Sequence, residues 1–247
     1  NSGHPGAPMG LAPVAHTLFS KVLKFNPKNP KFFNRDRFVL SNGHACALQY
    51  VMLHLSGYDV SMDDLKSFRQ LHSKCPGHPE SFRTPGVEVS TGPLGQGIAN
   101  SVGFAIAQTH LAALYNKPGF DVIDNDVFVV CGDGCLQEGI AQEAVSLAGH
   151  LKLGRLTLLY DDNGIQIDGE TDLAFTDNTH AKFEALGWHV QEVKDGNSDV
   201  RGLLAAIEAA RAVKDKPSII IVKTTIGLGA AKQGTEEVHG SPLGKED

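Results

Sequence analysis

The sequence predicts an α/β fold, a doubly wound and mostly parallel sheet with helices on both faces. Continuous apolar runs rich in β-branched residues occupy 127–131, 156–160 and 218–224, as is typical of strands buried on both faces. Segments with helical periodicity separate these runs, as βαβ units require. The chain has 247 residues, of which 41% are hydrophobic, and it shows no internal repeat or linker. We therefore expect a single domain over 1–247.

The N-terminal half is predicted to be helical. Apolar residues recur at helical spacing over three segments: 14–23, 45–55 and 65–71. Ser61-Met-Asp-Asp64 has the pattern of a capping box that ends in an acid. A long helix is expected to follow the Gly-rich segment 91–97 and to run to about Tyr115. Its Ala, Gly, Ser and Ile residues predict a fully buried, closely packed helix.

The C-terminal half alternates between strands and helices. Between the strands already named, helices are expected over 136–150, near 178–186 and over 199–213. A further strand is expected near 188–193, and the Gly-rich tail 227–234 is expected to be a loop.

Composition excludes several classes of protein. The net charge of −6 and the lack of a basic run argue against a nucleic-acid partner, and no apolar stretch reaches membrane-spanning length. The four cysteines form no Cys-x-x-Cys pair, which favours reduced thiols in the cytoplasm or a similar compartment. Because the chain starts without Met, we expect a fragment whose N-terminus is uninformative, so a plastid location stays open.

Two acidic strand ends predict a metal site. Strand 127–131 runs into Gly132-Asp133-Gly134, and strand 156–160 is followed by a cluster that ends in Asn163. Either motif alone is more often an ordinary turn, but parallel strands end at the same edge of a sheet, so Asp133 and Asn163 should lie side by side. A carboxylate at this turn would repel a phosphate, and Mg²⁺ between them removes the conflict. The residues therefore predict a Mg²⁺-diphosphate site.

Glycine and histidine loops predict a polar pocket. The segment 91–97 is neither a Walker A loop nor a Rossmann fingerprint, although its glycines would let the backbone approach a flat ligand. His4, His44, His78 and His239 all lie in Gly/Pro loops, where binding residues concentrate. Because none has a neighbour at metal-ligand spacing, we expect them to handle protons and sugar hydroxyls and not to bind zinc.

Seven motifs, in order along the whole chain, together resemble the transketolase family. They are 2–10, 41–44, 76–80, 91–97, 132–139, 161–163 and 238–240. The resemblance implies a thiamine diphosphate-binding fold and, for this chain, the N-terminal diphosphate-binding domain. It also implies an enzyme that moves a two-carbon ketol unit from a ketose phosphate to an aldose phosphate in the pentose phosphate pathway or the Calvin cycle. A lone Gly-Asp-Gly would indicate only some thiamine diphosphate enzyme.

The resemblance implies roles for named residues. Asp133, the Asn163 side chain and the Ile165 carbonyl would hold Mg²⁺, for which Ca²⁺ could substitute. Two diphosphate oxygens and a water would complete the octahedron. The implied cofactor contacts are Gly132 at the diphosphate, Gly92 and Leu94 at the aminopyrimidine, Ile167 and Ile226 at the thiazolium, and His44 and His239 near the diphosphate and reacting carbon. The implied catalytic residues are His4, His44, His78 and His239, of which His4, His78 and His239 would also bind substrate.

The resemblance also implies a partner. Glu138 and Glu143 resemble interface acids of the family's homodimer. Small residues on the same helix would let it approach another helix closely: Gly139, Ala141, Ala144 and Ala148. The family takes a glutamate for the aminopyrimidine, and arginine and serine residues for the substrate phosphate, from a pyrimidine-binding domain of the partner subunit. The pyrimidine-binding and C-terminal domains are absent from this chain, so we expect the chain alone to be inactive.

Other functions stay open at this stage. Dihydroxyacetone synthase and 1-deoxyxylulose-5-phosphate synthase share the chemistry, although the histidine set favours transketolase over the latter. An inactive module that only binds the cofactor or another Mg²⁺-phosphate ligand is a second class. An NAD-dependent oxidoreductase is disfavoured because the Gly-x-Gly-x-x-Gly turn and its acidic partner are missing.

Overall fold

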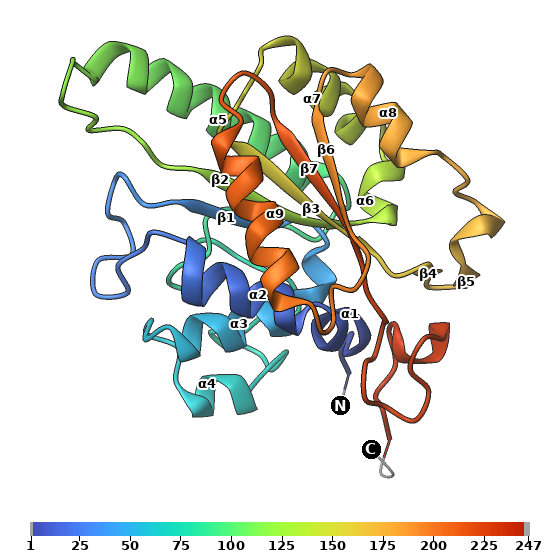
Figure 1. Cartoon of the computed structure of the whole chain (residues 1–247). Helices are drawn as coiled ribbons and strands as arrows, with labels where there is room; N and C mark the ends of the chain where they lie inside the picture. The colour runs from blue at the N-terminus through green and yellow to red at the C-terminus, as the bar shows by residue number, and fades with distance from the viewer. Residues whose placement is uncertain (1, 245–247) are drawn as a thin grey trace.

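A five-stranded parallel sheet forms the centre of the computed structural model, which describes residues 2–244 (Figure 1). The strand order is β1-β2-β3-β7-β6, and all four neighbouring pairs are parallel. The strands are β1 (Arg37–Leu40), β2 (Val127–Gly132), β3 (Leu156–Asp162), β7 (Ser218–Lys223) and β6 (His189–Val193). The predicted α/β class is confirmed.

Helices cover both faces of this sheet (Figure 1). On one face lie α5 (Gln96–Tyr115), α7 (Gly139–His150) and α8 (Thr179–Ala185); on the other lie α2 (Ala12–Thr17), α3 (Cys46–Leu55) and α9 (Val200–Ala212). Alternate residues of β7 serve the two faces. Ile219 and Ile221 belong to the apolar cluster under α5 and α7, whereas Ile220 and Val222 belong to the cluster under α9. Burial of both faces explains why β7 has a continuous apolar sequence.

The remaining elements are short. They are α1 (Gly6–Gly10), a π-helical turn η1 (Leu18–Val22), η2 (Gly43–Ala45), α4 (Met62–Lys66), α6 (Asp133–Gln137), the antiparallel pair β4 (Ile165–Gln166) and β5 (Gly169–Glu170), η3 (Thr171–Leu173) and η4 (Glu236–Val238). Of these, η2, α6 and the β4–β5 pair directly follow the carboxyl ends of β1, β2 and β3.

Two expectations for the N-terminal half were wrong. The helix expected over 65–71 ends at Lys66 as α4, because Arg69 and His72 adopt left-handed backbone angles with φ of 62° and 64°. The four-residue strand β1 was not expected at all. The capping box is confirmed: the Ser61 hydroxyl accepts from the Asp64 N–H at 3.0 Å, and the Asp64 carboxylate accepts from the Ser61 N–H at 2.7 Å.

Two expectations for helices on the α5 face also need correction. The helix expected over 136–150 is two helices, α6 and α7, because Glu138 is extended with ψ of 135°. Helix α5 is buried along one side only, and an apolar set of its side chains faces outward: Ile106, Leu111, Leu114 and Tyr115. The small residues Ala141, Ala144 and Ala148 are buried where α7 packs against α5, so the close helix approach occurs within this chain.

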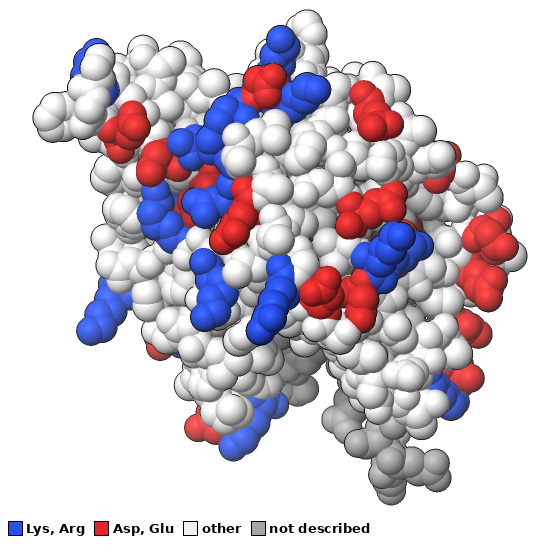
Figure 2. All heavy atoms as spheres, viewed as in Figure 1, with Lys and Arg blue, Asp and Glu red and all other residues white. Residues whose placement is uncertain are grey.

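The surface carries charges of both signs, and the thiols lie beneath it. On the face seen in Figure 2, basic and acidic side chains lie interspersed in small groups among larger uncharged areas. All four cysteines are free and buried. Across residues 2–244, no helix is long and apolar enough to cross a membrane.

The chain changes face between β1 and β2. After β1 it enters η2 and α3 on one face, and after β2 it enters α6 and α7 on the other. Ligands of open α/β sheets bind in the crevice that such a change opens at the carboxyl ends of the strands. The loops after Leu40 and Gly132 are therefore the expected ligand-binding loops of this sheet.

Candidate functional site

A pocket of about 430 Å³ lies at this crevice and collects every metal-, cofactor- and substrate-site residue predicted from the sequence. These are His4, His44, His78, Gly92, Leu94, Gly132, Asp133, Asn163, Ile165, Ile167, Ile226 and His239. They come from eight separate stretches of the chain, so the fold brings together residues that are far apart in the sequence. Glu138 and Glu143 are not among the lining residues and are exposed to solvent.

The acidic end of the pocket lies at the ends of β2 and β3. Asp133 is the first residue of α6 and only 6% exposed. Burial raises the pKa of Asp133; the Gln166 amide and backbone N–H groups oppose this rise, and the nearby Asp162 adds to it. The Asn163 carboxamide is fixed at both ends: its Nδ2 donates to Asp161 at 2.8 Å, and its Oδ1 accepts from the Ile165 N–H at 2.9 Å.

These residues fit a magnesium ion that is shared with a phosphate ligand. Among the described residues, no three or more His, Cys, Asp or Glu side chains cluster as a metal cage. Mg²⁺ does not need one, because it is usually held by one or two carboxylates together with substrate phosphates. Two buried polar atoms on the same pocket, Asn42 Oδ1 and Gln166 Nε2, have no hydrogen bond of ordinary geometry within residues 2–244. Such atoms suit a polar ligand.

The glycine loop lies on the turn after β1. The Thr91 hydroxyl donates to the Leu40 carbonyl at 2.8 Å, and a Cβ added at Gly43 would lie 2.7 Å from that hydroxyl. Gly92 has a φ of 143°, and a Cβ there would lie 3.1 Å from the His78 ring. Only glycine fits this position without strain, so the loop backbone lies open to the pocket.

Three histidine rings meet on the other side of the pocket. The ring centroids of His4 and His44, and those of His44 and His239, are 5.1 Å apart, while His4 and His239 are 5.9 Å apart. The C-terminal tail brings His239 there because it packs on α1. The Gly227 N–H donates to the Gly6 carbonyl at 2.9 Å, and a Cβ at Gly6 would lie 2.6 Å from Ile226.

The four histidines of this pocket all have lowered pKa values. Burial lowers the pKa of His4 to about 4, with further lowering by Arg69, His239 and His78. Burial lowers the pKa of His44 to about 3, with further lowering by His239, His4 and His78. Burial also lowers the pKa values of His78 and His239. Each neutral ring offers one N–H donor and one acceptor, which suits hydroxyl groups better than anions.

The pocket also contains polar residues to which the sequence analysis gave no role. Asn42 and Asp161 lie within the quoted motifs 41–44 and 161–163, so the signal was present but their roles were not assigned. Gln166 had no sequence signal. Asp161 is 2% exposed, and burial raises its pKa to about 7. Of the two apolar residues expected at the thiazolium, Ile226 is 1% exposed and Ile167 is 63% exposed.

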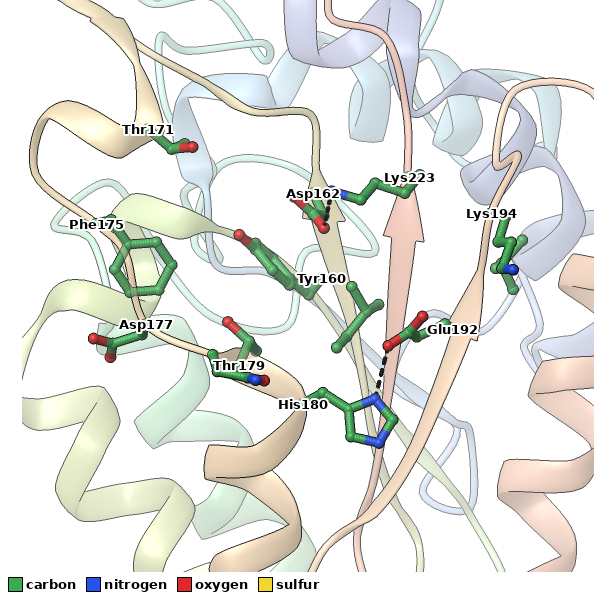
Figure 3. A pocket seen from close by; sticks show the side chains of 13 residues that line it. Tyr160, Asp162, Thr171, Phe175, Asp177, Thr179, His180, Glu192, Lys194 and Lys223 are labelled. Carbon is green, nitrogen blue, oxygen red and sulfur yellow. Dashed lines mark hydrogen bonds and ion pairs between the residues drawn. The ribbon is translucent and has the colours of Figure 1, made fainter.

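A second pocket, of about 310 Å³, lies at the carboxyl ends of β3, β7 and β6 (Figure 3). Asp162 points toward Lys223 in an ion pair of 2.6 Å, and His180 points toward Glu192 at 2.7 Å. None of the predicted site residues lines this pocket. The geometry therefore separates Asp162 from its neighbours Asp161 and Asn163 in the first pocket.

Comparison with known proteins identifies the family of this chain. Residues 1–247 match the family model described as transketolase, thiamine diphosphate binding domain. The chain is 60% identical to the chloroplastic transketolase of Solanum tuberosum over 249 residues and to transketolase 1 of Saccharomyces cerevisiae over 247 residues. These matches cover 100% of this chain but 34% and 36% of those proteins.

A solved structure of transketolase from Leishmania mexicana superposes with a TM-score of 0.99 at 59% identity, over 100% of this chain and 37% of that one. The chain thus spans roughly a third of the length of the relatives that it matches. It belongs to the transketolase family and corresponds to that family's thiamine diphosphate binding domain.

Proposed function

We propose that this chain forms the Mg²⁺-thiamine diphosphate site of a transketolase, which transfers a two-carbon ketol unit from a ketose phosphate to an aldose phosphate. The observation that carries the proposal is one pocket that joins Asp133 and Asn163 to four histidines. Solved complexes of the Pichia stipitis transketolase with sedoheptulose-7-phosphate and fructose-6-phosphate support this substrate class. The reaction would serve the pentose phosphate pathway or the Calvin cycle. Buried free thiols and the chloroplastic and yeast relatives suit a reducing compartment, the cytoplasm or a plastid.

Each part of the pocket has a task in this proposal. When bound, thiamine diphosphate supplies a nucleophilic carbon that attacks a ketose carbonyl. Asp133, the Asn163 side chain and the Ile165 carbonyl hold Mg²⁺, and Ca²⁺ can take its place because both cations prefer oxygen ligands. Gly132 and the start of α6 would face the diphosphate, Gly92 and Leu94 the aminopyrimidine, and Ile167 and Ile226 the thiazolium; all six residues line the pocket.

The histidines bind and orient the substrate. His44 and His239 would contact the diphosphate and the reacting carbon, and His4, His78 and His239, which line the same pocket, would contact the sugar. The Nδ1 atoms of His4 and His239 are buried and, within residues 2–244, have no hydrogen-bond partner. As neutral rings they can donate to or accept from sugar hydroxyls and carry a proton at a ring nitrogen.

The exposed apolar face of α5 and α7 is an argument for a subunit interface. Ile106, Leu111, Ile140 and Leu147 are each between 37% and 44% exposed on these two helices, and an apolar face of this kind marks an interaction site. We propose a homodimer that covers this face, with Glu138 and Glu143 at its interface. The partner's pyrimidine-binding domain then completes the cofactor site, so residues 1–247 alone lack activity.

An assay of residues 1–247 with and without a separately supplied pyrimidine-binding domain tests the proposal. The mixture contains a ketose phosphate, an aldose phosphate, Mg²⁺ and thiamine diphosphate. Ketol transfer is expected only when the second domain is present, whereas full turnover by residues 1–247 alone would contradict the incomplete site. Transfer to formaldehyde, or condensation of pyruvate with glyceraldehyde phosphate, as the preferred reaction would instead indicate dihydroxyacetone synthase or 1-deoxyxylulose-5-phosphate synthase. Cofactor binding that never leads to turnover in any pairing would indicate an inactive module.

A further inference from the structure

Asp161 is a buried carboxylate at the centre of the sheet edge. It lies on β3, paired in register with Gly132 of β2 and Val222 of β7. Its side chain is 2% exposed and borders the pocket that contains Asp133 and Asn163. Charged side chains are rarely buried this deeply unless their oxygens are hydrogen-bonded.

Both oxygens of Asp161 accept hydrogen bonds. Oδ1 accepts from the Thr224 hydroxyl at 2.5 Å, and Oδ2 accepts from Nδ2 of Asn163 at 2.8 Å. The second bond fixes the Nδ2 end of the Asn163 carboxamide, and the Ile165 N–H fixes its Oδ1 end. With Nδ2 turned toward Asp161, Oδ1 is turned away from it, toward the Ile165 N–H.

The opposite orientation of this carboxamide is unfavourable next to a carboxylate. It would place Oδ1 against Asp161 Oδ2, leave a buried charged oxygen without its donor, and present an NH₂ group in place of the metal-binding oxygen. The same amide oxygen also accepts from Ile165, whose carbonyl is the third proposed ligand. One buried carboxylate therefore controls the side-chain ligand directly and is linked to the backbone ligand through it.

We propose that Asp161 is a positioning residue for the divalent cation: it locks the Asn163 carboxamide so that its oxygen, and not its nitrogen, faces the metal. The inference rests on the Mg²⁺-thiamine diphosphate site proposed above. Substitution of a residue that hydrogen-bonds to a metal ligand typically lowers metal affinity by about 10–100-fold.

The neighbouring Asp162 offers a matched control. It is the next residue on β3, but its carboxylate lines the second pocket, where it pairs with Lys223 at 2.6 Å (Figure 3). Asp162→Asn removes the same charge as Asp161→Asn at a neighbouring position without touching the Asn163 carboxamide. The two variants therefore separate orientation of the ligand from loss of a nearby charge.

The experiment measures Mg²⁺ affinity by calorimetry at saturating thiamine diphosphate, in the natural polypeptide that carries these residues. Asp161→Asn keeps the side-chain volume but removes the charged acceptor of the Asn163 Nδ2, so that the Ile165 N–H alone of the two described contacts still orients the carboxamide. The Mg²⁺ affinity should therefore fall by about 10–100-fold. Asp162→Asn should retain the wild-type affinity. Thermal unfolding checks that both variants are folded.

A double-mutant cycle with Asn163→Asp completes the test. A carboxylate at position 163 presents an oxygen in either orientation, and Asp161→Asn then supplies it with a donor. In that background Asp161→Asn should strengthen Mg²⁺ binding instead of weakening it. Equal losses for Asp161→Asn and Asp162→Asn, or the same loss with Asn and with Asp at 163, would overturn the inference. Failure of the wild-type protein to bind Mg²⁺ with thiamine diphosphate would instead overturn the proposed function.

Discussion

Acidification should destabilise this fold through His44. Burial and the neighbouring histidine rings lower the pKa of His44 from 6.5 to about 3 in the folded state. The unfolded chain regains the ordinary pKa of 6.5. Below pH 6.5 the unfolded state therefore binds a proton that the folded state does not bind. The contribution is present in full above this pH and is lost as the pH falls toward 3.

The expected loss follows from the two pKa values of His44. At pH 5 the imidazole is almost fully protonated in the unfolded chain and almost fully neutral in the fold, which lowers the free energy of unfolding by about 2 kcal/mol relative to pH 7. His44→Gln keeps a polar side chain but cannot take up the proton. The variant should therefore lose about 2 kcal/mol less than the wild-type protein over the same pH range.

Urea unfolding at pH 7 and pH 5, for the wild-type protein and for His44→Gln, measures this difference directly. The other groups that titrate between pH 5 and pH 7 contribute equally to the unfolding free energy of both proteins, provided that the substitution leaves their surroundings intact. Their contributions therefore cancel in the difference between the two proteins. A matching fall in unfolding free energy for both proteins would refute the argument, because it would mean that His44 is protonated to the same extent in the folded and unfolded states.

Three further predictions concern the metal, the substrate and the fold. Asp133→Ala removes a ligand charge about 2.1 Å from a divalent cation, worth about 4 kcal/mol even at the dielectric constant of water, so Mg²⁺-dependent binding of thiamine diphosphate should weaken about 10³-fold; an unchanged calorimetric titration would exclude Asp133 as a ligand. His78→Ala should lower turnover on the order of 10²-fold or more while cofactor affinity is retained, because His78 lies on a different loop from the metal ligands; parallel losses would place His78 at the cofactor. Gly149→Ala would put a Cβ 1.9 Å from the Leu186 carbonyl oxygen and should lower the free energy of unfolding by roughly 1–3 kcal/mol; an unshifted urea midpoint would contradict this packing.

The sequence predicts the centre of this fold better than its edges. The strands β2, β3 and β7 are buried on both faces, so their apolar runs are unmistakable. The edge strand β1 has four residues and begins with an arginine, which gives little pattern to recognise. The error at 65–71 has a local cause, since nothing in the sequence marks Arg69 and His72 as left-handed.

Part of the candidate site could likewise be predicted from the sequence, and part could not. Asp133 and Asn163 could be paired from sequence because parallel strands end at one edge, and the structure places both on one pocket. The meeting of His4, His44 and His239 depends on the tail folding back onto α1, which no local pattern encodes. Asp161 was quoted within a motif, but its orientation toward Asn163 is visible only in three dimensions.

The loops proposed to bind the cofactor precede α5 and α7, the two helices that carry the exposed apolar face. Helix α5 starts directly after Gly95, and a Cβ at Gly95 would lie 2.6 Å from the Cβ of Glu138, the residue just before α7. Both helices therefore start beside the loops proposed to hold the aminopyrimidine and the diphosphate. A subunit that docks on the exposed side of α5 and α7 would contact the N-terminal ends of both helices. It would thereby hold in place the loops that precede the two helices. In the proposed homodimer, dimer formation would complete the cofactor site. A charged substitution on this face, such as Leu111→Asp, should then weaken dimer formation and cofactor affinity together. Sedimentation velocity combined with a thiamine diphosphate titration measures both quantities, and a monomeric variant that binds the cofactor as tightly as the wild-type protein would separate them.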